Sequence, residues 1–217
     1  MKFYIDEVPI IFPYDYIYPE QLQYMKEMKK GLDAGGHMVL EMPSGTGKTI
    51  TLLALLVAYI NYHRDVERRK VVYCTRTVVE MTKTMEELRR LVKFWEQEGE
   101  DLKPIVGICL SARKNLCIES KVSGFTYPSE VDAACRGVTA PWVDEKCDFF
   151  EGANAINLPA GIHSLDNVKE FGREHNACPY YLVRNAIGFA DIIVQSYLYL
   201  VDPKVSGTVM EHLSANS

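Results

Sequence analysis

The sequence predicts an α/β protein with a parallel sheet, interrupted by a cysteine-rich insert. Three observations lead to this prediction. A glycine-rich loop stands between an apolar run and a long helical stretch, and apolar runs alternate with helical stripes up to residue 110. Four cysteines and four prolines then occupy residues 111–184, before an apolar run returns at 190–196. Strands that alternate with helices are typical of crossover units in a parallel sheet.

The glycine-rich loop has the composition of a phosphate-binding loop. Gly45 and Gly47 let the backbone turn so that successive N–H groups face phosphate oxygens, and the following helix adds its positive end. Lys48 supplies a charge for the phosphates, and the Thr49 hydroxyl a ligand for Mg²⁺. Met42 stands where the usual pattern has glycine, and an ordinary surface turn is the alternative. The expected binding residues are Pro43, Ser44, Gly45, Thr46, Gly47, Lys48 and Thr49, of which the last two are also catalytic candidates.

The segments around the loop are expected in the order that a P-loop requires. Residues 37–40 predict a buried strand, and residues 49–62 an unbroken helix. Upstream, we expect an edge strand at 3–7 and a helix at 19–32. Gln21 carries the donor and acceptor needed to read the edge of an adenine, although an ordinary surface glutamine is the alternative.

Two further strands are predicted after the loop helix, at 70–74 and 105–110. Thr77 and Glu80 form a capping box that starts a helix between these strands. Cys74 and Cys109 lie in the strands themselves, and we expect both as buried apolar fillers.

Thr75, Arg76 and Thr77 occupy the carboxyl end of a predicted strand, where ligands of parallel sheets bind. Two hydroxyls and a guanidinium there could hold a nucleic-acid backbone. A helix cap with a surface charge is the alternative.

Residues 111–184 show no periodicity that resolves into regular elements. Between the four cysteines lie 17, 11 and 30 residues, so the closely spaced cysteine pair of structural zinc sites is missing. Widely spaced thiolates fit an iron–sulfur cluster better, since four cysteines complete a [4Fe–4S] cube. Zinc and unrelated thiols remain alternatives. The candidate metal ligands are Cys117, Cys135, Cys147 and Cys178.

The composition is that of a globular protein, with 47% hydrophobic and 24% charged residues. The net charge of −5 does not exclude nucleic acid, because a local basic groove can bind phosphates on an acidic protein. No apolar run is long enough to span a bilayer, and residues 1–7 do not read as a signal peptide. We therefore expect an intracellular protein with reduced thiols and no membrane partner.

The apolar run at 190–196 predicts a return to the sheet, followed by an aromatic turn at 197–202 and a short helix at 203–213. The insert therefore interrupts one domain. We expect three parts: residues 1–110, the insert at 111–184, and the return at 185–217.

With these parts in place, the chain resembles the XPD family, the iron–sulfur superfamily-two DNA helicases of the transcription and repair factor TFIIH. The matching segments follow the family's order over nearly all of the chain, and the family also has a residue other than glycine at the Met42 position. The segments that carry the resemblance are Phe12–Tyr14, Tyr18–Gln21, Glu41–Thr49, Tyr73–Thr77, Ser111–Cys117, Cys178–Tyr181 and Asp202–Lys204.

The resemblance implies the first part of a RecA-like helicase motor domain 1, with ATP and Mg²⁺ at the P-loop and Gln21. It also implies that the four insert cysteines match the ligands of a [4Fe–4S] cluster. The implied activity is ATP-dependent 5′→3′ unwinding in the nucleus, in nucleotide excision repair and transcription initiation. The implied partners are single-stranded or forked DNA and other TFIIH subunits.

Arg113, beside the first cysteine ligand, matches a position near DNA and the cluster. Tyr197 is a further DNA candidate, together with Thr75, Arg76 and Thr77. Relatives commonly carry Tyr and His where this chain has Gln195 and Leu198, so the aromatic segment departs from the family's pattern.

No apolar strand that ends in Asp-Glu-x-His occurs in the sequence, and a second motor domain is missing. We therefore expect the N-terminal portion of a longer protein, without appreciable ATP turnover of its own. Two alternatives stay open: a P-loop NTPase without a DNA role, and a nucleotide- and cluster-binding interaction module.

Overall fold

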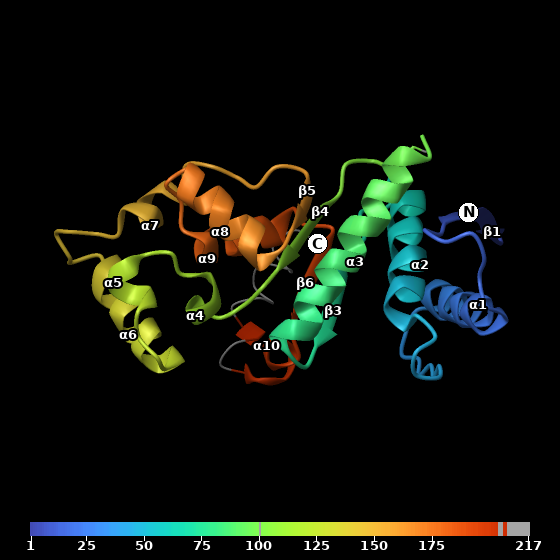
Figure 1. The fold of residues 1–217 in the computed structure, drawn as a ribbon, viewed down its shortest axis with the longest axis horizontal. Coiled ribbons are helices and arrows are strands. Elements are labelled where there is room, and N and C mark those ends of the chain that lie inside the picture. The colour runs from blue at the N-terminus through green and yellow to red at the C-terminus, as the bar shows by residue number, and fades with distance from the viewer. Residues whose placement is uncertain (100, 204–205, 208–217) are drawn as a thin grey trace. The chain divides into compact units, whose positions relative to one another are not determined.

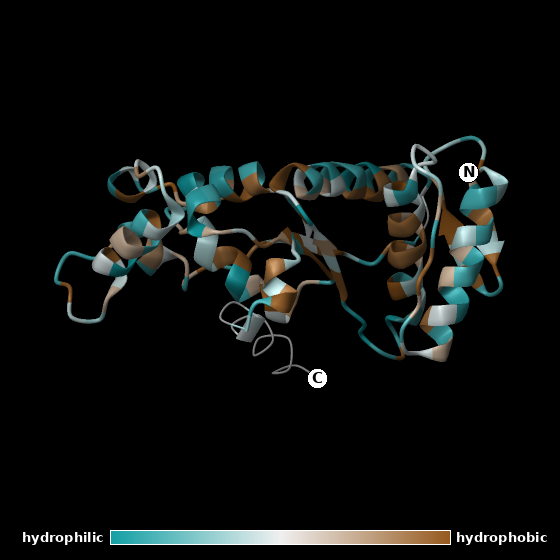
Figure 2. Cartoon of the chain, turned by 90° about the horizontal axis from the view of Figure 1, so that it is seen from below, coloured by the Kyte–Doolittle hydropathy of each residue, from teal (hydrophilic) through white to brown (hydrophobic). Residues whose placement is uncertain are grey.

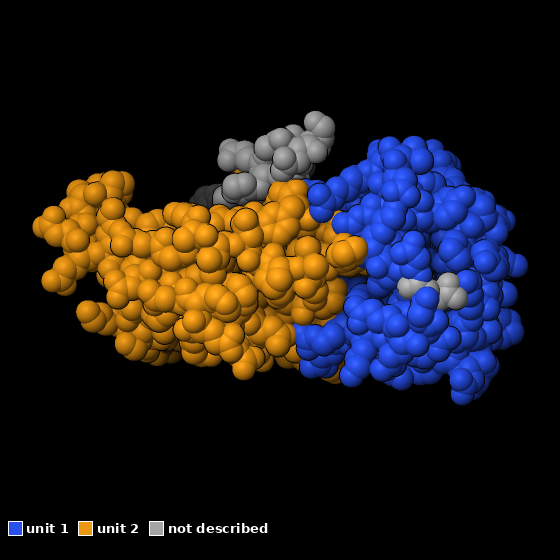
Figure 3. Space-filling view, turned by 90° about the horizontal axis from the view of Figure 1, so that it is seen from above, with its two compact units in different colours: residues 1–71, 86–103 blue, residues 72–85, 104–217 orange. Residues whose placement is uncertain are grey.

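The computed structural model describes residues 1–99, 101–203 and 206–207 (Figure 1). The chain divides into two compact units, coloured separately in Figure 3. Unit 1 comprises residues 1–71 and 86–103, and unit 2 comprises residues 72–85 and 104–217. These limits differ from the three parts expected from the sequence, whose boundaries stay a prediction.

Unit 1 begins with an antiparallel hairpin of β1 (Lys2–Ile5) and β2 (Val8–Ile11). Two helices follow, α1 (Pro19–Ala34) and α2 (Lys48–His63), and α2 packs against both β2 and α1. Because α2 is covered on several sides, it is apolar over most of its surface (Figure 2). The edge strand and both helices predicted for this region are confirmed.

A buried cation joins the hairpin to the helices of unit 1. The Lys29 side chain is only 3% exposed, and its Nζ lies 3.0 Å from Glu7 Oε1 and 2.7 Å from Asp33 Oδ2. Asp33 also accepts a hydrogen bond of 2.9 Å from the Tyr59 hydroxyl on α2. The hydrogen bond from the Lys29 ammonium is the main cause that holds the pKa of each carboxyl, Glu7 and Asp33, below its ordinary value.

The predicted strand at residues 37–40 is wrong. These residues belong to no strand, and the Val39 side chain is 98% exposed. A strand needs a neighbour that satisfies its backbone N–H and C=O groups. Among the described residues, none of the strands pairs with this segment.

Unit 2 is built on a four-stranded sheet with the order β3-β6-β4-β5. The central strand β4 is parallel to both of its neighbours, and Ile108 lies opposite Ile193 on one side and His163 on the other. The predicted strands at 70–74, 105–110 and 190–196 are confirmed. Their bounds are β3 (Val71–Thr75), β4 (Val106–Cys109) and β6 (Ile192–Ser196), and β5 spans Gly161–His163.

The helix between the first two strands of this sheet, α3 (Val78–Gln97), begins with the predicted capping box. Glu80 N donates to Thr77 Oγ1 at 3.1 Å, and Thr77 N donates to Glu80 Oε2 at 3.3 Å. The two thiols in the strands differ in burial. Cys109 is fully buried, as predicted, whereas Cys74 is half-buried and accepts a hydrogen bond from Gln195 Nε2 at 3.7 Å.

Residues 111–184 are mainly helical, so the expectation of a region without regular elements is wrong. Several of these helices have only four or five residues, which is too short for a periodic pattern. Pro128 and Pro179 begin two of them, and Ser164 caps a third by accepting from Asn167 N. The helices are α4 (Arg113–Leu116), α5 (Ser120–Ser123), α6 (Pro128–Thr139), α7 (Asp148–Gly152), α8 (Leu165–Glu174) and α9 (Pro179–Asn185).

The core of unit 2 joins this segment to the sheet. Buried apolar side chains from β4, β6, α8 and α9 form one cluster, which includes Ile108, Val168, Leu182 and Ile193. A smaller cluster of Val122, Val131 and Cys135 packs α5 against α6.

After β6, the predicted aromatic turn is a short helix, α10 (Leu198–Val201). The predicted helix at 203–213 falls largely outside the described residues. Among the helices that the structure describes, none has the length and apolar character needed to cross a membrane.

Replacing Lys29 by Met is expected to lower the free energy of unfolding by about 1–3 kcal/mol, because it leaves hydrogen-bonded carboxylates without their cation. The matched control is Lys30→Met, which removes a side chain that is 68% exposed and should change the stability by less than about 0.5 kcal/mol. Chemical denaturation of both variants checks the difference. Equal losses in the two variants would contradict the role given to Lys29.

The ion pairs of Lys29 should also make the free energy of unfolding depend on pH. Because the folded-state pKa values of Glu7 and Asp33 are lowered, their stabilisation is present above their unfolded values, near pH 4, and is lost as the pH falls through the folded values. The unfolding free energy should therefore drop less between pH 6 and pH 3 in Lys29→Met than in the unchanged chain.

Candidate functional site

The P-loop leads directly into α2. Gly45 and Gly47 have φ values of +81° and +74°, in the left-handed region that favours glycine. Gly47 is the N-cap of α2, and Lys48 is the first helical residue. The loop therefore presents backbone groups and a helix N-terminus at one place, which is the arrangement that anions occupy.

The Lys48 side chain folds back over its own loop. Its ammonium donates to Met42 O at 2.9 Å and to Pro43 O at 3.4 Å, while Thr46 Oγ1 donates to Pro43 O at 2.7 Å. Thr49 lies half-buried in the first turn of the helix. A phosphate that binds Lys48 has to replace the two backbone carbonyls as its partner.

Gln21 lies against this loop, from the first turn of α1. The residue is 5% exposed. Its Nε2 donates to Thr46 O at 3.0 Å, and its Oε1 accepts from Tyr18 N at 2.9 Å. The structure thus brings Gln21 and the loop together, as expected, but both polar groups of the amide already have protein partners.

Aromatic residues line a cavity of about 220 Å³ beside Gln21 and the loop. The rings of Tyr16 and Tyr18 meet edge to face with centroids 5.3 Å apart. Tyr14 is held from α3, since Arg90 Nη1 donates to its hydroxyl at 3.0 Å. Sequence reasoning used Tyr14 and Tyr18 only as family markers, although clustered tyrosines before a P-loop are a signal for a surface on which a flat ring can stack.

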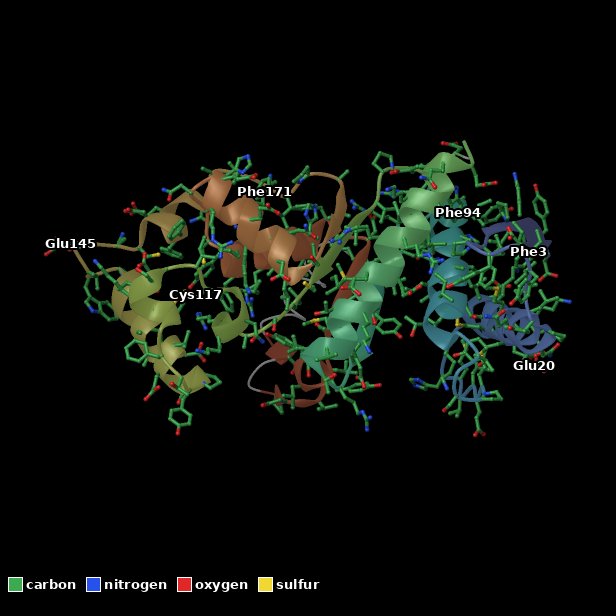
Figure 4. All side chains as sticks on the ribbon, viewed as in Figure 1. Phe3, Glu20, Phe94, Cys117, Glu145 and Phe171 are labelled. Atoms are coloured by element: carbon green, nitrogen blue, oxygen red, sulfur yellow. The ribbon has the colours of Figure 1, made fainter. Side chains whose placement is uncertain are left out.

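The four insert cysteines line one small cavity of about 20 Å³. Cys117 follows α4 and lies between α4 and α5 (Figure 4), and Cys135 belongs to α6. Cys147 and Cys178 are the N-caps of α7 and α9. Helix ends and backbone turns therefore bring together thiols that are far apart in the sequence.

Backbone hydrogen bonds fix two of these thiols, one between α7 and the start of α9 and one between the start of α7 and α6. Cys178 N donates to Phe149 O at 2.6 Å, and Cys147 N donates to Val138 O at 2.9 Å. A Cβ added at Gly152 would lie 2.0 Å from Asn176 O, so the two backbones meet where no side chain fits.

Burial is the main cause that raises the pKa of three of the thiols. The pKa of Cys178 rises to about 11, and those of Cys117 and Cys147 rise as well. The neighbouring thiols act in the same direction, whereas backbone N–H groups near Cys147 and Cys178 oppose it. These thiols are therefore held protonated unless a cation takes the place of the proton.

The four thiols suit one of the two metal groups considered from the sequence better than the other. Within the described ranges, no group of three or more His, Cys, Asp or Glu is placed to hold a metal ion. A single zinc needs its sulfurs at about 2.3 Å from one centre. A [4Fe–4S] cluster binds each thiolate through a different iron, so its ligands stand further apart, and four cysteines around one cavity have the right chemistry for it.

Arg113 lies next to this cavity in unit 2. Its Nη1 is 3.3 Å from Asp132 Oδ1, and its guanidinium stacks 4.1 Å from the centroid of Tyr180. Arg184 stacks on the same ring at 3.4 Å. Nothing in the spacing of the sequence indicated that two guanidinium groups contact the ring of Tyr180.

The other DNA candidates meet at the ends of β3 and β6, where Tyr197 N donates to Thr75 O at 3.0 Å. Thr75 is buried, and its hydroxyl donates to Thr77 O at 3.2 Å. Thr77 is used in the helix cap. Arg76 and Tyr197 keep exposed side chains, at 81% and 47%.

Gln195 and Leu198, the two positions at which the aromatic segment departs from the family's pattern, differ in burial. Gln195 is 2% exposed, whereas Leu198 is 61% exposed. The Gln195 position therefore faces the interior of unit 2 and the Leu198 position faces solvent.

The chain is an α/β protein, with a parallel sheet in unit 2 and a glycine-rich loop that opens α2 in unit 1. Among the described residues, no strand directly precedes this loop, as one does in the usual P-loop arrangement. Residues 73–217 match the DEAD_2 family, and the chain belongs to this family.

Similar proteins agree with this assignment. The chain is 46% identical over its whole length to the general transcription and DNA repair factor IIH helicase subunit XPD of Arabidopsis thaliana. It is 40% identical to subunit XPD/RAD3 of Saccharomyces cerevisiae, and it spans about 30% of the length of each of these relatives. A solved structure titled XPD_Helicase superposes on 90% of this chain with a TM-score of 0.58 and 18% identity, and the match covers 30% of that structure's chain. The family resemblance inferred from the sequence is confirmed.

Replacing Gly152 by Ala is expected to destabilise unit 2 by about 1–3 kcal/mol, because the added methyl group meets the Asn176 carbonyl. Gly137→Ala is the matched control, since no atom lies within 4 Å of a Cβ at that position. In a helix this control should be neutral or stabilising by up to about 1 kcal/mol. Thermal unfolding of the two variants separates these outcomes, and equal midpoints would contradict the packing described for α7.

Proposed function

We propose that this chain is the nucleotide-binding part of an ATP-dependent 5′→3′ DNA helicase subunit of TFIIH, acting in nucleotide excision repair and transcription initiation. The observation that carries the proposal is the P-loop at the start of α2, in a chain 40–46% identical over essentially its whole length to named TFIIH helicase subunits. The proposed location is the nucleus, and the proposed partners are other TFIIH subunits and single-stranded or forked DNA.

ATP is the proposed ligand of the P-loop. Lys48 would bind the β- and γ-phosphates after leaving the Met42 and Pro43 carbonyls. Thr49, in the first turn of α2, would ligate Mg²⁺. Backbone N–H groups from Ser44 to Thr49 would surround the phosphates, with Pro43 opening the loop, and the cavity lined by Tyr16 and Tyr18 would take the base.

The finer architecture belongs to the same proposal. Residues 1–110 and 185–217 would form part of a RecA-like motor domain 1, and residues 111–184 an iron–sulfur insert. Cys117, Cys135, Cys147 and Cys178 would hold a [4Fe–4S] cluster, supported by their common cavity. When bound, the cluster would supply four covalent links between separate helices, so it would stabilise the insert.

For DNA, Arg76 and Tyr197 are the proposed contacts, because a guanidinium suits phosphate and an aromatic ring suits a base. Thr75 and Thr77 would act by shaping the turn between β3 and α3, since their hydroxyls are engaged within the protein. Arg113 would place its charge between the cysteine cavity and bound DNA.

Replacing Lys48 by Ala should weaken ATP binding by about tenfold to a hundredfold, because it removes the charged donor to the phosphates. The control is Lys26→Ala on the exposed face of α1, which should leave the affinity unchanged. Titration with a fluorescent ATP analogue measures both variants. Equal affinity of Lys48→Ala and the unchanged chain would refute the assignment of the P-loop.

Anaerobically purified protein is expected to be brown, with about four irons per chain. Cys135→Ser or Cys178→Ser should bleach the colour, while Cys74→Ser should keep it, because Cys74 lies in β3 and does not line the cavity. Iron analysis and visible absorbance are the measurements. A colourless protein with one zinc would overturn the cluster proposal.

A further inference from the structure

Tyr14 is a cavity residue whose side chain is contacted from a distant part of the chain. It lies between β2 and α1, where residues 12–18 form neither helix nor strand. In this segment Tyr16 and Tyr18 support each other, since their hydroxyls lie 3.3 Å apart. The ring of Tyr14 packs against Phe12, with centroids 5.5 Å apart, and its other described contact is with Arg90 on α3.

Arg90 contacts the Tyr14 side chain in two ways. Its Nη1 donates to the hydroxyl at 3.0 Å, and its Cζ lies 4.8 Å from the centroid of the ring. A guanidinium within about 6 Å of the centroid is attracted by the quadrupole of the ring. The hydrogen bond fixes the hydroxyl end of the side chain, and the cation–π contact fixes the ring itself.

The helix that carries Arg90 is anchored in the core. Leu88 and Leu91, on either side of Arg90 in the sequence, are fully buried, and residues 86–103 belong to unit 1 together with the cavity. The segment 12–18 has no ladder of backbone hydrogen bonds of its own, and such segments move more easily than helices. Arg90 therefore restrains an irregular segment from a fixed point on a helix.

We propose that Arg90 is a positioning residue for the nucleotide site: it holds the ring of Tyr14 at the cavity, where the ring packs against the base, and it does not bind the phosphates. The inference rests on the proposed function of the P-loop, and it adds α3 to the elements that build the site. An aromatic ring suits this role because every base has a flat face on which it can stack.

The test compares ATP with inorganic tripolyphosphate, which has no base. Arg90→Met removes both contacts with Tyr14 and keeps a side chain of similar length. Its matched control is Lys93→Met, which removes a positive charge from an exposed position of the same helix that does not line the cavity. Calorimetric titration in the presence of Mg²⁺ gives the dissociation constants.

A positioning role predicts that Arg90→Met weakens ATP by about threefold to tenfold, while tripolyphosphate changes by less than about twofold. Lys93→Met should change neither ligand by more than about twofold. Equal losses of ATP and tripolyphosphate in Arg90→Met would mean that its charge attracts the phosphates. That result, or unchanged ATP affinity, would overturn the inference and leave the P-loop assignment intact.

A double variant shows whether Arg90 acts through Tyr14. Tyr14→Phe removes the hydroxyl and keeps the ring. Combined with Arg90→Met, it should weaken ATP no further than Arg90→Met alone, because the hydroxyl has then already lost its donor. If the two factors multiply instead, Arg90 acts independently of Tyr14 and the inference is wrong.

A further measurement needs no ligand, so it separates this inference from the proposed function. In the nucleotide-free chain, Arg90→Met should speed hydrogen exchange of the amides at 14–17 by about threefold or more, while amides in the middle of α2 keep their rates. Unchanged exchange at 14–17 would contradict the role of Arg90. If the unchanged chain binds neither ATP nor tripolyphosphate, the proposed function fails, whatever the exchange rates show.

Discussion

Unit 2 depends on the pairing of β4 with two strands that are distant in the sequence. Ile108 lies opposite both His163 and Ile193, so the chain must leave the sheet after β4 and return to it twice. Leu110 N extends the pairing by donating to Val194 O at 2.8 Å, and Val106 N donates to the buried Asp191 carboxylate at the same distance. These bonds close the base of the 111–190 segment, which lowers the entropic cost of bringing its cysteines together.

The parts of the fold that could be predicted are those whose signals lie within a few residues. Pro19 starts α1, and the Thr77–Glu80 box starts α3. Local sequence could not decide whether residues 37–40 form a strand, because a strand forms only where another strand satisfies its backbone N–H and C=O groups. The short helices of the insert gave no periodic pattern, although Ser164 and Pro179 were readable start signals for two of them.

The same distinction between local and long-range signals applies to the candidate sites. The left-handed glycines of the loop and the start of α2 could be predicted from residue type and order, whereas nucleotide binding by the loop and Gln21 stays a prediction. The atoms that Gln21 contacts could not be predicted from the sequence, because these contacts depend on how α1 packs against the loop. Thr75 illustrates the same limit: the sequence left open whether its hydroxyl holds a ligand or serves a helix cap, and in the structure it turns inward to Thr77 O.

The two candidate sites are held by different means, and this affects how each can change. The P-loop is kept in place by single hydrogen bonds to side chains, from Gln21 and Lys48, and a phosphate can exchange with the partners of Lys48 at little cost. The cysteine cavity is held by backbones in direct contact. Added side chains at Gly152 and Gly172 would meet the Asn176 and Ala177 carbonyls at 2.0 and 2.5 Å. A site built from close backbone contacts resists rearrangement, so the proposed nucleotide site is the one whose geometry could respond to a ligand.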